Sequence, residues 1–433
     1  MNPEELKSSD LKTEVEWYRS MLLKGNCLDT LKTLPDNSVD SIVTDPPYEL
    51  GFMGKSWDNS GIAYSTDLWA ECLRVLKSGG HLLAFSGSRT YHRMVVAIED
   101  SGFEIRDQIM WLYGSGFPKS LDVSKAIDKA AGHWRGKAGK ESSVAIAKSG
   151  FGADGWSPQT KEAQTPEAQQ WQGWGTALKP AHEPIVVARK PLIGTVANNV
   201  LTYGTGALNI DGSRVGTEAR TFNSKGIQSG SGNYVGDDWK PEKNPVTVEG
   251  RWPANVIHDG SEEVLAGFPD SKSTRIGNSN NGKKGGLMFG GSEQKLTERS
   301  HDYRDEGSAA RFFYCAKASK SERNAGLEGL PERRESDRER DDGVGGDNPR
   351  NRTNEARQNF HPTVKPLALM RYLIKLVTPP GGIVLDPFLG SGTTAVAATL
   401  EGFEWIGCEM TEDYFPIIEA RVEWALNQPK TLM

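Results

Sequence analysis

The run 381–394, Gly-Gly-Ile-Val-Leu-Asp-Pro-Phe-Leu-Gly-Ser-Gly-Thr-Thr, places the strongest constraint on the fold. Its apolar residues Ile383–Leu385 predict a short buried strand. The turn that follows contains Gly390 and Gly392, which let the backbone approach a ligand closely. An Ala-rich helix is expected over about 393–400. Strand, glycine loop and helix in this order are typical of a ligand-binding edge in an α/β sheet.

A second apolar run, Phe403–Cys408, follows the predicted helix and leads into Glu409. An acid at the carboxyl end of such a strand can bond the ribose hydroxyls of a nucleotide-like cofactor. The loop lacks the lysine of a triphosphate-binding loop. It also lacks the third glycine of a dinucleotide fingerprint, because Gly392 is followed by Thr-Thr-Ala. The pattern favours a cofactor without a triphosphate and leaves a nicotinamide oxidoreductase as the weaker alternative.

A third apolar run, Ser41–Val43, leads into Thr44-Asp45-Pro46-Pro47-Tyr48. Asp45 offers a carboxylate acceptor, and the Pro-Pro step holds the Pro46 carbonyl in an extended backbone without a competing N–H group. Tyr48 offers a flat face on which an unstacked base gains ~1–3 kcal/mol. These groups suit an exocyclic amino group on a DNA base that has rotated out of its duplex.

Together these motifs resemble the amino-methyltransferases of DNA, the S-adenosylmethionine-dependent enzymes that make N6-methyladenine or N4-methylcytosine. The Asp-Pro-Pro-Tyr motif comes first and the glycine loop last, which resembles the β group of that family, whose fold is circularly permuted. The resemblance implies a Rossmann-like, doubly wound, mostly parallel α/β sheet. It also implies three parts: 20–114 with the catalytic motif, 115–357 as a large inserted target-recognition region with mobile loops, and 358–433 with the cofactor motifs.

The resemblance extends to two further motifs and implies two sets of site residues. The run 361–366, His-Pro-Thr-Val-Lys-Pro, is similar to the family's third cofactor element, and Gly-Asn-Cys at 25–27 replaces its usual Gly-Asp-Cys. An amide at position 26 still forms hydrogen bonds. The implied catalytic residues are Asp45, Pro46, Pro47 and Tyr48. The implied cofactor-binding residues are Asn26, Cys27, Asp45, His361, Thr363, Lys365, Asp386, Phe388, Gly390, Ser391, Gly392, Thr393 and Glu409.

The choice of target base follows from the first residue of the tetrapeptide. Cytosine-specific members of the family more often carry Ser there, so Asp45 favours the N6 amino group of adenine, with N4-cytosine as the alternative. Two other functions stay open. Enzymes that methylate protein glutamine use a related motif but usually place the glycine loop first. A catalytically silent DNA-binding module is disfavoured by the intact Asp45 and Tyr48.

Composition limits the setting in which the chain works. The chain has 433 residues, only 36% hydrophobic, which predicts more than one domain with long polar insertions. Its net charge is −6, yet Lys and Arg outnumber Asp and Glu between residues 115 and 375. DNA binding needs positive charge locally rather than overall, so double-stranded DNA stays the expected partner. The resemblance also implies a homodimer.

The four cysteines show no paired C-x-x-C spacing, which predicts neither a metal site nor a disulfide framework and favours a reducing cytoplasm. The resemblance implies a bacterial or phage-encoded protein. No apolar run approaches 18 residues, so no membrane partner is expected. Local patterns predict structure at three further places in the chain. A helix over Trp69–Leu76 should stop at the glycines near position 80. The segment Glu332–Gln358 should be a mobile linker, with a loop that orders on DNA as the alternative. His182-Glu183 should be structural or on the surface.

Overall fold

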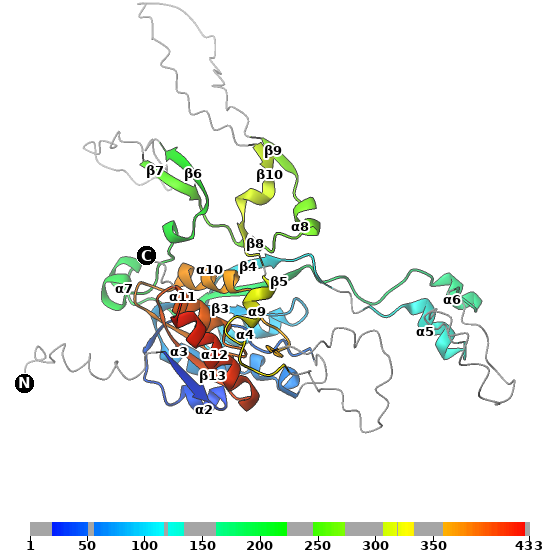
Figure 1. Ribbon diagram of the computed structural model, residues 1–433, viewed down its shortest axis with the longest axis horizontal. Coiled ribbons are helices and arrows are strands. Elements are labelled where there is room, and N and C mark those ends of the chain that lie inside the picture. The colour runs from blue at the N-terminus through cyan, green and yellow to red at the C-terminus, as the bar shows by residue number, and fades with distance from the viewer. Residues whose placement is uncertain are drawn as a thin grey trace, which may run out of the picture. The chain divides into compact units, whose positions relative to one another are not determined.

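A nine-stranded, mostly parallel sheet forms the centre of the computed structural model (Figure 1). The structure describes residues 20–50, 56–116, 120–133, 162–222, 246–272, 306–317, 319–332 and 358–428. The predicted linker Glu332–Gln358 lies outside the described residues except at its two ends. The chain divides into a main unit, which contains residues up to Tyr113 and from His182 onward, and a second unit, Gly114–Ala181.

The sheet joins strands from distant parts of the sequence. The strands in spatial order are β1 (Met21–Lys24), β13 (Glu404–Glu409), β12 (Ile383–Asp386), β2 (Val39–Thr44), β3 (Leu76–Phe85), β5 (His182–Arg189), β4 (Glu104–Leu112), β8 (Val256–His258) and β11 (Tyr314–Cys315). All neighbours within this sheet pair in parallel except β5, which runs antiparallel to both β3 and β4. The predicted mostly parallel α/β sheet is confirmed.

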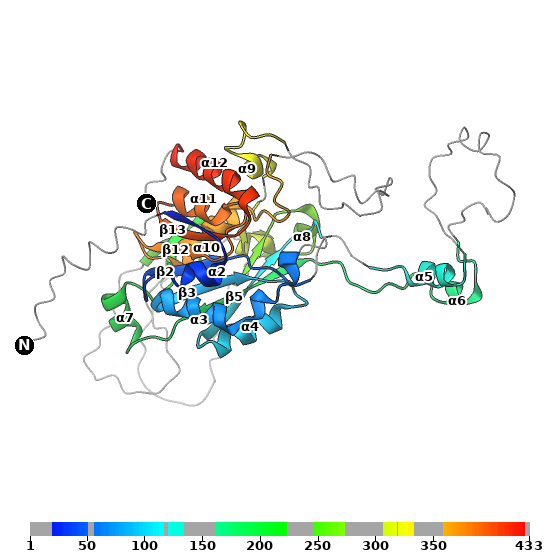
Figure 2. The ribbon, with the colours of Figure 1, turned by 90° about the horizontal axis from the view of Figure 1, so that it is seen from below.

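Helices cover both faces of the sheet (Figure 2). One layer contains α2 (Cys27–Leu31), α3 (Thr66–Val75) and α4 (Tyr91–Asp100), and the opposite layer contains α10 (Leu367–Val377), α11 (Thr393–Leu400) and α12 (Phe415–Leu426).

Because neighbouring strand residues point to opposite faces, Val43 and Leu83 pack into the core beneath α10–α12, whereas Ile42 and Leu82 pack into the core beneath α2–α4. Burial on both faces explains why these strands read as continuous apolar runs.

The order of the strands reverses between β12 and β2. From β12 the chain continues through α11 to β13, whereas from β2 it continues through α3 to β3 on the other side. Ligands in open α/β sheets bind outside the carboxyl ends of the strands at such a switch point. The fold therefore places the binding crevice where the Asp-Pro-Pro-Tyr motif and the glycine loop both leave the sheet.

Two features of the sheet differ from expectation. The helix α3 ends one residue early, and β3 begins at Leu76 and includes the glycines that were expected to end the helix. Gly79 has φ +78°, so it lets the strand bend without ending it. The strand β5 comes from within 115–357, so part of the predicted inserted region belongs to the main sheet.

The remaining elements are short. The main unit also has α7 (Val196–Tyr203), α8 (Glu262–Ala266), α9 (Lys320–Asn324), the antiparallel pair β6 (Val215–Phe222) and β7 (Val246–Arg251), the pair β9 (Asp270–Lys272) and β10 (Glu306–Ser308), and the 3-10 turns η3 (Ser56–Asn59), η4 (Ile62–Tyr64), η5 (Asp211–Ser213), η6 (Ala309–Phe312) and η8 (Glu412–Tyr414).

The second unit contains α5 (Val123–Ala130) and α6 (Pro166–Gln170). These two helices are joined by the buried carboxylate of Asp128, which accepts hydrogen bonds from the backbone N–H and the hydroxyl of Thr165.

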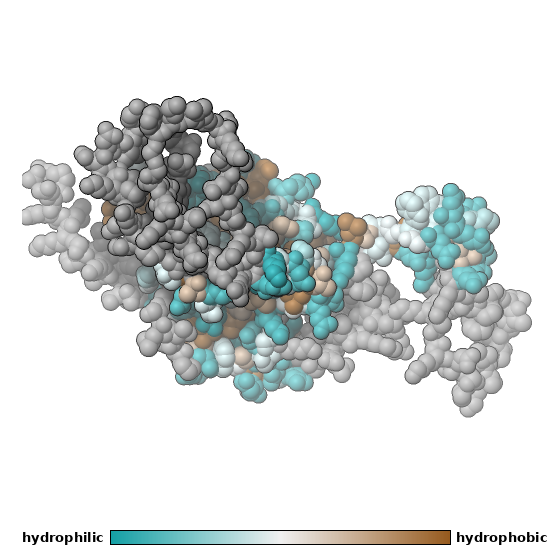
Figure 3. All heavy atoms as spheres, turned by 90° about the horizontal axis from the view of Figure 1, so that it is seen from above, coloured by the Kyte–Doolittle hydropathy of each residue, from teal (hydrophilic) through white to brown (hydrophobic). Residues whose placement is uncertain are grey.

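No helix in the described ranges is long and apolar enough to cross a bilayer. The same residues contain no group of three or more His, Cys, Asp or Glu side chains arranged to hold a metal ion. Figure 3 shows hydrophilic and hydrophobic residues mixed over the described surface of the main unit on that face.

Candidate active site

The two sequence motifs meet at the ends of neighbouring parallel strands. Leu385 of β12 pairs with Ile42 of β2, so both strands leave the sheet at the same edge. Thr44, the last residue of β2, donates a hydrogen bond of 2.6 Å to the buried carboxylate of Asp386, the last residue of β12. Motifs more than three hundred residues apart in the sequence are thus in direct contact.

Asp45 lies in a cluster of charged and hydroxyl groups at this edge. The Lys365 ammonium donates to Asp45 Oδ2 at 2.6 Å and to the Tyr48 hydroxyl at 3.2 Å. The Tyr48 hydroxyl donates in turn to Glu183 Oε2 at 2.9 Å, and Lys365 lies 3.4 Å from that same oxygen. The three charged side chains are only 9–20% exposed, so little solvent screens them.

The second carboxylate oxygen of Asp45 is the chemically informative atom. Asp45 Oδ1 is buried and has no hydrogen-bond partner among the described residues. A buried acceptor without a donor costs about 1–3 kcal/mol, so such an atom in a strand-end crevice indicates a place for a donor from a ligand. Lys365 holds the other oxygen and thereby fixes the plane of the carboxylate.

The electrostatics of the cluster keep Lys365 charged and Tyr48 neutral. Burial alone lowers the pKa of Lys365, but the carboxylates of Asp45 and Glu183 outweigh burial and raise this pKa above its usual range. Burial raises the pKa of Asp45, and the ammonium of Lys365 opposes that rise. Burial and the nearby carboxylates hold the pKa of Tyr48 well above its usual value, so its hydroxyl keeps its proton.

The glycine loop is held open by hydrogen bonds to its two flanking acids. The Asp386 carboxylate accepts from the Thr394 hydroxyl at 2.5 Å and from the Phe388 N–H at 3.0 Å. The Glu409 carboxylate accepts from the N–H of Gly390 at 2.8 Å and of Thr411 at 2.7 Å. Burial raises the pKa of Asp386 to about 6.

Glycine is required at position 390 for two reasons. Its φ is +55°, a left-handed conformation that side chains disfavour, and a Cβ there would lie 2.8 Å from His361 Nε2. The imidazole of His361 also packs edge-on against Tyr414, with ring centroids 4.7 Å apart. Burial and the nearby Arg323 lower the pKa of His361 to about 3, so a neutral ring faces the loop.

The other predicted cofactor residues lie around this loop or beside Glu409. Asn26 caps α2 by accepting from the Leu28 N–H, and it follows β1, which pairs with β13 at Glu409. Cys27 is buried, and burial raises the pKa of its thiol to about 11. Thr363 is exposed, and its N–H donates to His361 Nδ1 at 3.4 Å.

Sequence analysis missed two residues of this site. Glu183 was expected to be structural or on the surface, but β5 brings it to Tyr48 and Lys365. Arg421 of α12 is buried and donates to the Ser391 carbonyl at 2.6 Å and to the hydroxyls of Ser391 and Thr393 at 3.1 Å. A short apolar run after an acid, Ile185–Ala188, was the only signal for Glu183, and nothing in the sequence indicated Arg421.

Comparison with known proteins gives a family match over most of the chain. The family described as DNA methylase matches residues 39–420. The type II methyltransferase M.HinfI of Haemophilus influenzae is 29% identical over 23% of this chain and 33% of its own length. M.HpaI of Haemophilus parainfluenzae is 34% identical over 25% of this chain and 36% of its own length. M.HindIII of Haemophilus influenzae is 26% identical over 41% of this chain and 61% of its own length. The chain thus spans a third to three fifths of these relatives.

Solved structures with a similar chain course include the complex of M1.HpyAVI with SAM and the PvuII DNA methyltransferase, which is described as cytosine-N4-specific. The first has a TM-score of 0.36 at 14% identity and covers 93% of this chain and 98% of its own. The second has a TM-score of 0.42 at 14% identity and covers 93% and 86%. Both scores are too low to add to the family match.

Proposed function

This chain belongs to the DNA methylase family, and from that premise we propose that it transfers a methyl group from S-adenosylmethionine to the N6 amino group of an adenine rotated out of double-stranded DNA. The buried, unpartnered Asp45 Oδ1 is the observation that carries the proposal. An exocyclic amino group supplies the donor that this oxygen lacks. Its nitrogen is a weak nucleophile because its lone pair is delocalised into the ring, so it must be oriented by acceptors.

The residues around Asp45 divide this task. Lys365 fixes Asp45 Oδ2 and leaves Oδ1 for the amino group. Glu183 holds the Tyr48 hydroxyl, which sets the plane of the ring on which the base stacks. The Pro46 carbonyl is the second acceptor for the amino group. Acceptors placed in advance stabilise the positive charge that develops on the nitrogen, at no cost of rearrangement during the reaction.

Membership of this family supports S-adenosylmethionine as the cofactor, and the glycine loop fits such a group. The loop leaves β12 at the switch point of the sheet, where ligands of open α/β sheets bind, and the absence of a side chain at position 390 lets the His361 ring pack against the loop backbone. When bound, the cofactor supplies an electrophilic methyl group on a positively charged sulfur. We propose that Asp386, Phe388, Gly390, Ser391, Gly392, Thr393, His361, Thr363, Asn26, Cys27 and Glu409 surround it, with Lys365 at the boundary to the catalytic motif.

Incubation of the purified protein with unmethylated DNA and cofactor, followed by mass spectrometry of the nucleosides, tests the proposal. N6-methyladenine is expected. N4-methylcytosine without methyladenine would transfer the proposal to the alternative base, and methylglutamine in a protein with unmodified DNA would reject it. A catalytically silent DNA-binding module would bind DNA and yield neither base.

Substitution of Asp45 tests its role directly. Asp45→Ala removes the acceptor, while Glu183 still pairs with Lys365, so the fold is expected to persist. Transfer of a tritiated methyl group should fall below detection, and cofactor affinity by calorimetry should stay within a few-fold. The exposed aspartate of α3, in the variant Asp67→Ala, is the matched control and should retain full transfer. Full activity of Asp45→Ala would remove Asp45 from the mechanism.

Three wider features belong to the same proposal. The parts of region 115–357 outside the main sheet recognise the target sequence, which crosslinking to DNA followed by peptide mapping would test. The active form is a homodimer, which light scattering would measure. The protein works in the reducing cytoplasm of a bacterium, with or without a partner endonuclease, and the four free cysteines support that setting.

A further inference from the structure

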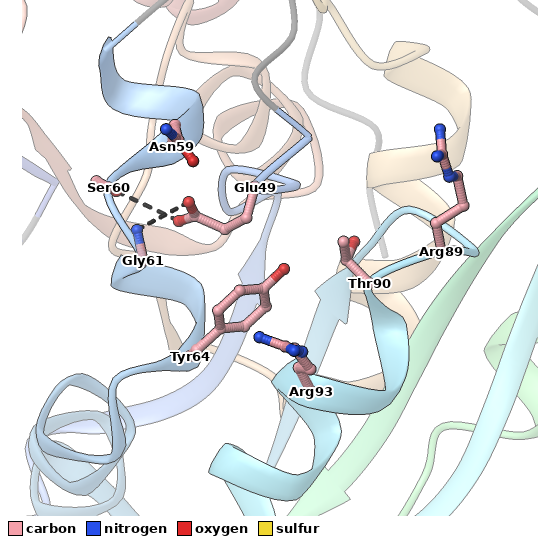
Figure 4. A pocket seen from close by; sticks show the side chains of 8 residues that line it. All are labelled: Glu49, Asn59, Ser60, Gly61, Tyr64, Arg89, Thr90 and Arg93. Carbon is pink, nitrogen blue, oxygen red and sulfur yellow. Dashed lines mark hydrogen bonds between the residues drawn. The ribbon is translucent and has the colours of Figure 1, made fainter.

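A pocket beside the Asp-Pro-Pro-Tyr motif is not used by the mechanism above. It has a volume of roughly 460 Å³, far more than the ~10–15 Å³ that a cavity needs to hold one water molecule. Figure 4 shows that η4 and its flanks line one side and that the turn into α4 lines the other. The lining residues are Glu49, Asn59, Ser60, Gly61, Tyr64, Arg89, Thr90 and Arg93.

The pocket adjoins the place where the target base would stack. Glu49 directly follows Tyr48 in the chain. On the opposite wall, the turn that carries Arg89 and Thr90 begins at Gly87, where a Cβ would lie 3.3 Å from the Tyr48 ring and 3.4 Å from the Thr90 hydroxyl. This turn leaves β3, the neighbour of β2, at the same edge of the sheet. Both walls of the pocket are thus close to Tyr48, one through the chain neighbour Glu49 and the other through the turn that begins at Gly87.

The lining of the pocket carries a net positive charge because it contains two arginines and one acid, Glu49. The Glu49 carboxylate accepts from the Gly61 N–H at 2.8 Å, from the Ser60 hydroxyl at 3.3 Å and from the Ala63 N–H at 3.4 Å. These bonds fold the η4 segment over the pocket and occupy the carboxylate.

The two arginines keep their positive charge available. Within the described ranges, neither Arg89 nor Arg93 forms an ion pair or a hydrogen bond through its guanidinium group. The guanidinium of Arg93 lies over the Tyr64 ring, 5.8 Å from its centroid, a contact that orients the group without neutralising it.

Glu49, in the lining of the pocket, has an unusual backbone conformation. Glu49 has φ +55°, which a non-glycine residue adopts at a cost of about 1–2 kcal/mol. The hydrogen bonds from its carboxylate to the η4 segment, and the bond from its own N–H to Asp58 at 3.0 Å, hold it in this conformation. These hydrogen bonds therefore fix Glu49 in the lining of the pocket, directly after Tyr48 in the chain.

We propose that this pocket binds a backbone phosphodiester of the DNA strand that carries the displaced nucleotide, through the guanidinium groups of Arg89 and Arg93. The inference rests on the proposed function and assigns a further contact to the same substrate. Guanidinium groups match phosphate oxygens in charge and in paired donor geometry. Holding a neighbouring phosphate in this pocket fixes the sugar and base of the target against Tyr48.

The test compares wild-type protein with the double variant Arg89→Ala, Arg93→Ala in DNA binding at several salt concentrations. Loss of one phosphate contact should make the slope of log affinity against log salt less negative by about 0.9 and weaken binding on the order of tenfold at about 50 mM salt. The KM for DNA should rise, because the contact that is lost is made to the bound substrate.

Two control variants and one control measurement accompany the experiment. Arg89→Lys, Arg93→Lys keeps the charge and should restore the salt slope. Arg106→Ala removes another exposed arginine, which lies on β4 and is paired with Glu104, and it should leave the slope unchanged. Calorimetry with S-adenosylmethionine alone should give the same affinity for wild type and double variant. Weaker cofactor binding with an unchanged salt slope would assign the pocket to the cofactor carboxylate and overturn the inference.

An unchanged slope in the double variant of an active enzyme would also overturn the inference while leaving the proposed function intact. Failure of the proposed function gives a different result, because the wild-type protein would then methylate no DNA. The salt slopes of DNA binding would still test the pocket independently.

Discussion

Replacement of Asp386 by asparagine should change how the stability of this protein depends on pH. Burial raises the pKa of Asp386 from 3.8 to about 6. An acid whose pKa is higher in the folded than in the unfolded state stabilises the fold only while it is protonated, and this contribution is lost as pH rises through the folded pKa. At 1.36 kcal/mol per pKa unit, the full loss is about 3 kcal/mol.

The asparagine introduced by Asp386→Asn cannot ionise, so the variant lacks this loss. Its side-chain oxygen can still accept from Thr44 and from the Phe388 N–H, which preserves the junction between β2 and β12. Urea unfolding at several pH values measures the difference in unfolding free energy between variant and wild type. That difference should move in favour of the variant by about 2 kcal/mol between pH of about 4.5 and about 7.5.

The control is Asp67→Asn, which removes an exposed carboxyl group of α3 and should follow the wild type across the same range. Parallel curves for Asp386→Asn and the wild type would refute the reasoning, since they would mean that burial does not disfavour the charged form of Asp386. A difference that moves in favour of the wild type as pH rises would refute it equally.

Three other substitutions test the parts that support the site. Glu183→Ala leaves the buried Tyr48 hydroxyl without its acceptor and should raise the activation free energy of transfer by about 1–3 kcal/mol, which lowers kcat. Glu183→Gln should recover part of this loss in steady-state kinetics. Gly390→Ala should lower the unfolding free energy by about 1–2 kcal/mol in urea, whereas Gly329→Ala, which has open space around its Cβ, should not. Arg421→Met orphans the Ser391 carbonyl and should cost about 1.5–3 kcal/mol in the same assay, and an unaltered midpoint would contradict its structural role.

The sequence predicted those parts of the fold in which local pattern and local structure coincide. The runs before Asp45 and Asp386 are apolar because β2 and β12 are buried on both faces, and each acid marks the point where its strand ends. The contact between these ends rests on backbone pairing between β2 and β12, which leaves no local pattern, and it followed only from the resemblance to a permuted family.

Glu183 illustrates why the rest could not be predicted. Functional acids were sought at the ends of strands because the expected sheet was parallel. The strand β5 runs antiparallel to its neighbours, so the beginning of this strand reaches the carboxyl edge of the sheet. Arg421 lies on a helix some thirty residues after the loop that it supports, and a single arginine carries no periodic signal. Both residues act through long-range contacts.

The pairing of β1 with β13 and of β2 with β12 has a consequence during synthesis. During translation Asp45 emerges from the ribosome long before Ile383 is synthesised. Until then β12 does not exist, so the edge of β2 that pairs with it stays unpaired. An unpaired apolar edge is prone to capture by other chains, and contacts this distant in sequence form slowly. Overproduction in a host with limited chaperone capacity should therefore yield aggregates rich in ribosome-bound fragments that end before the glycine loop.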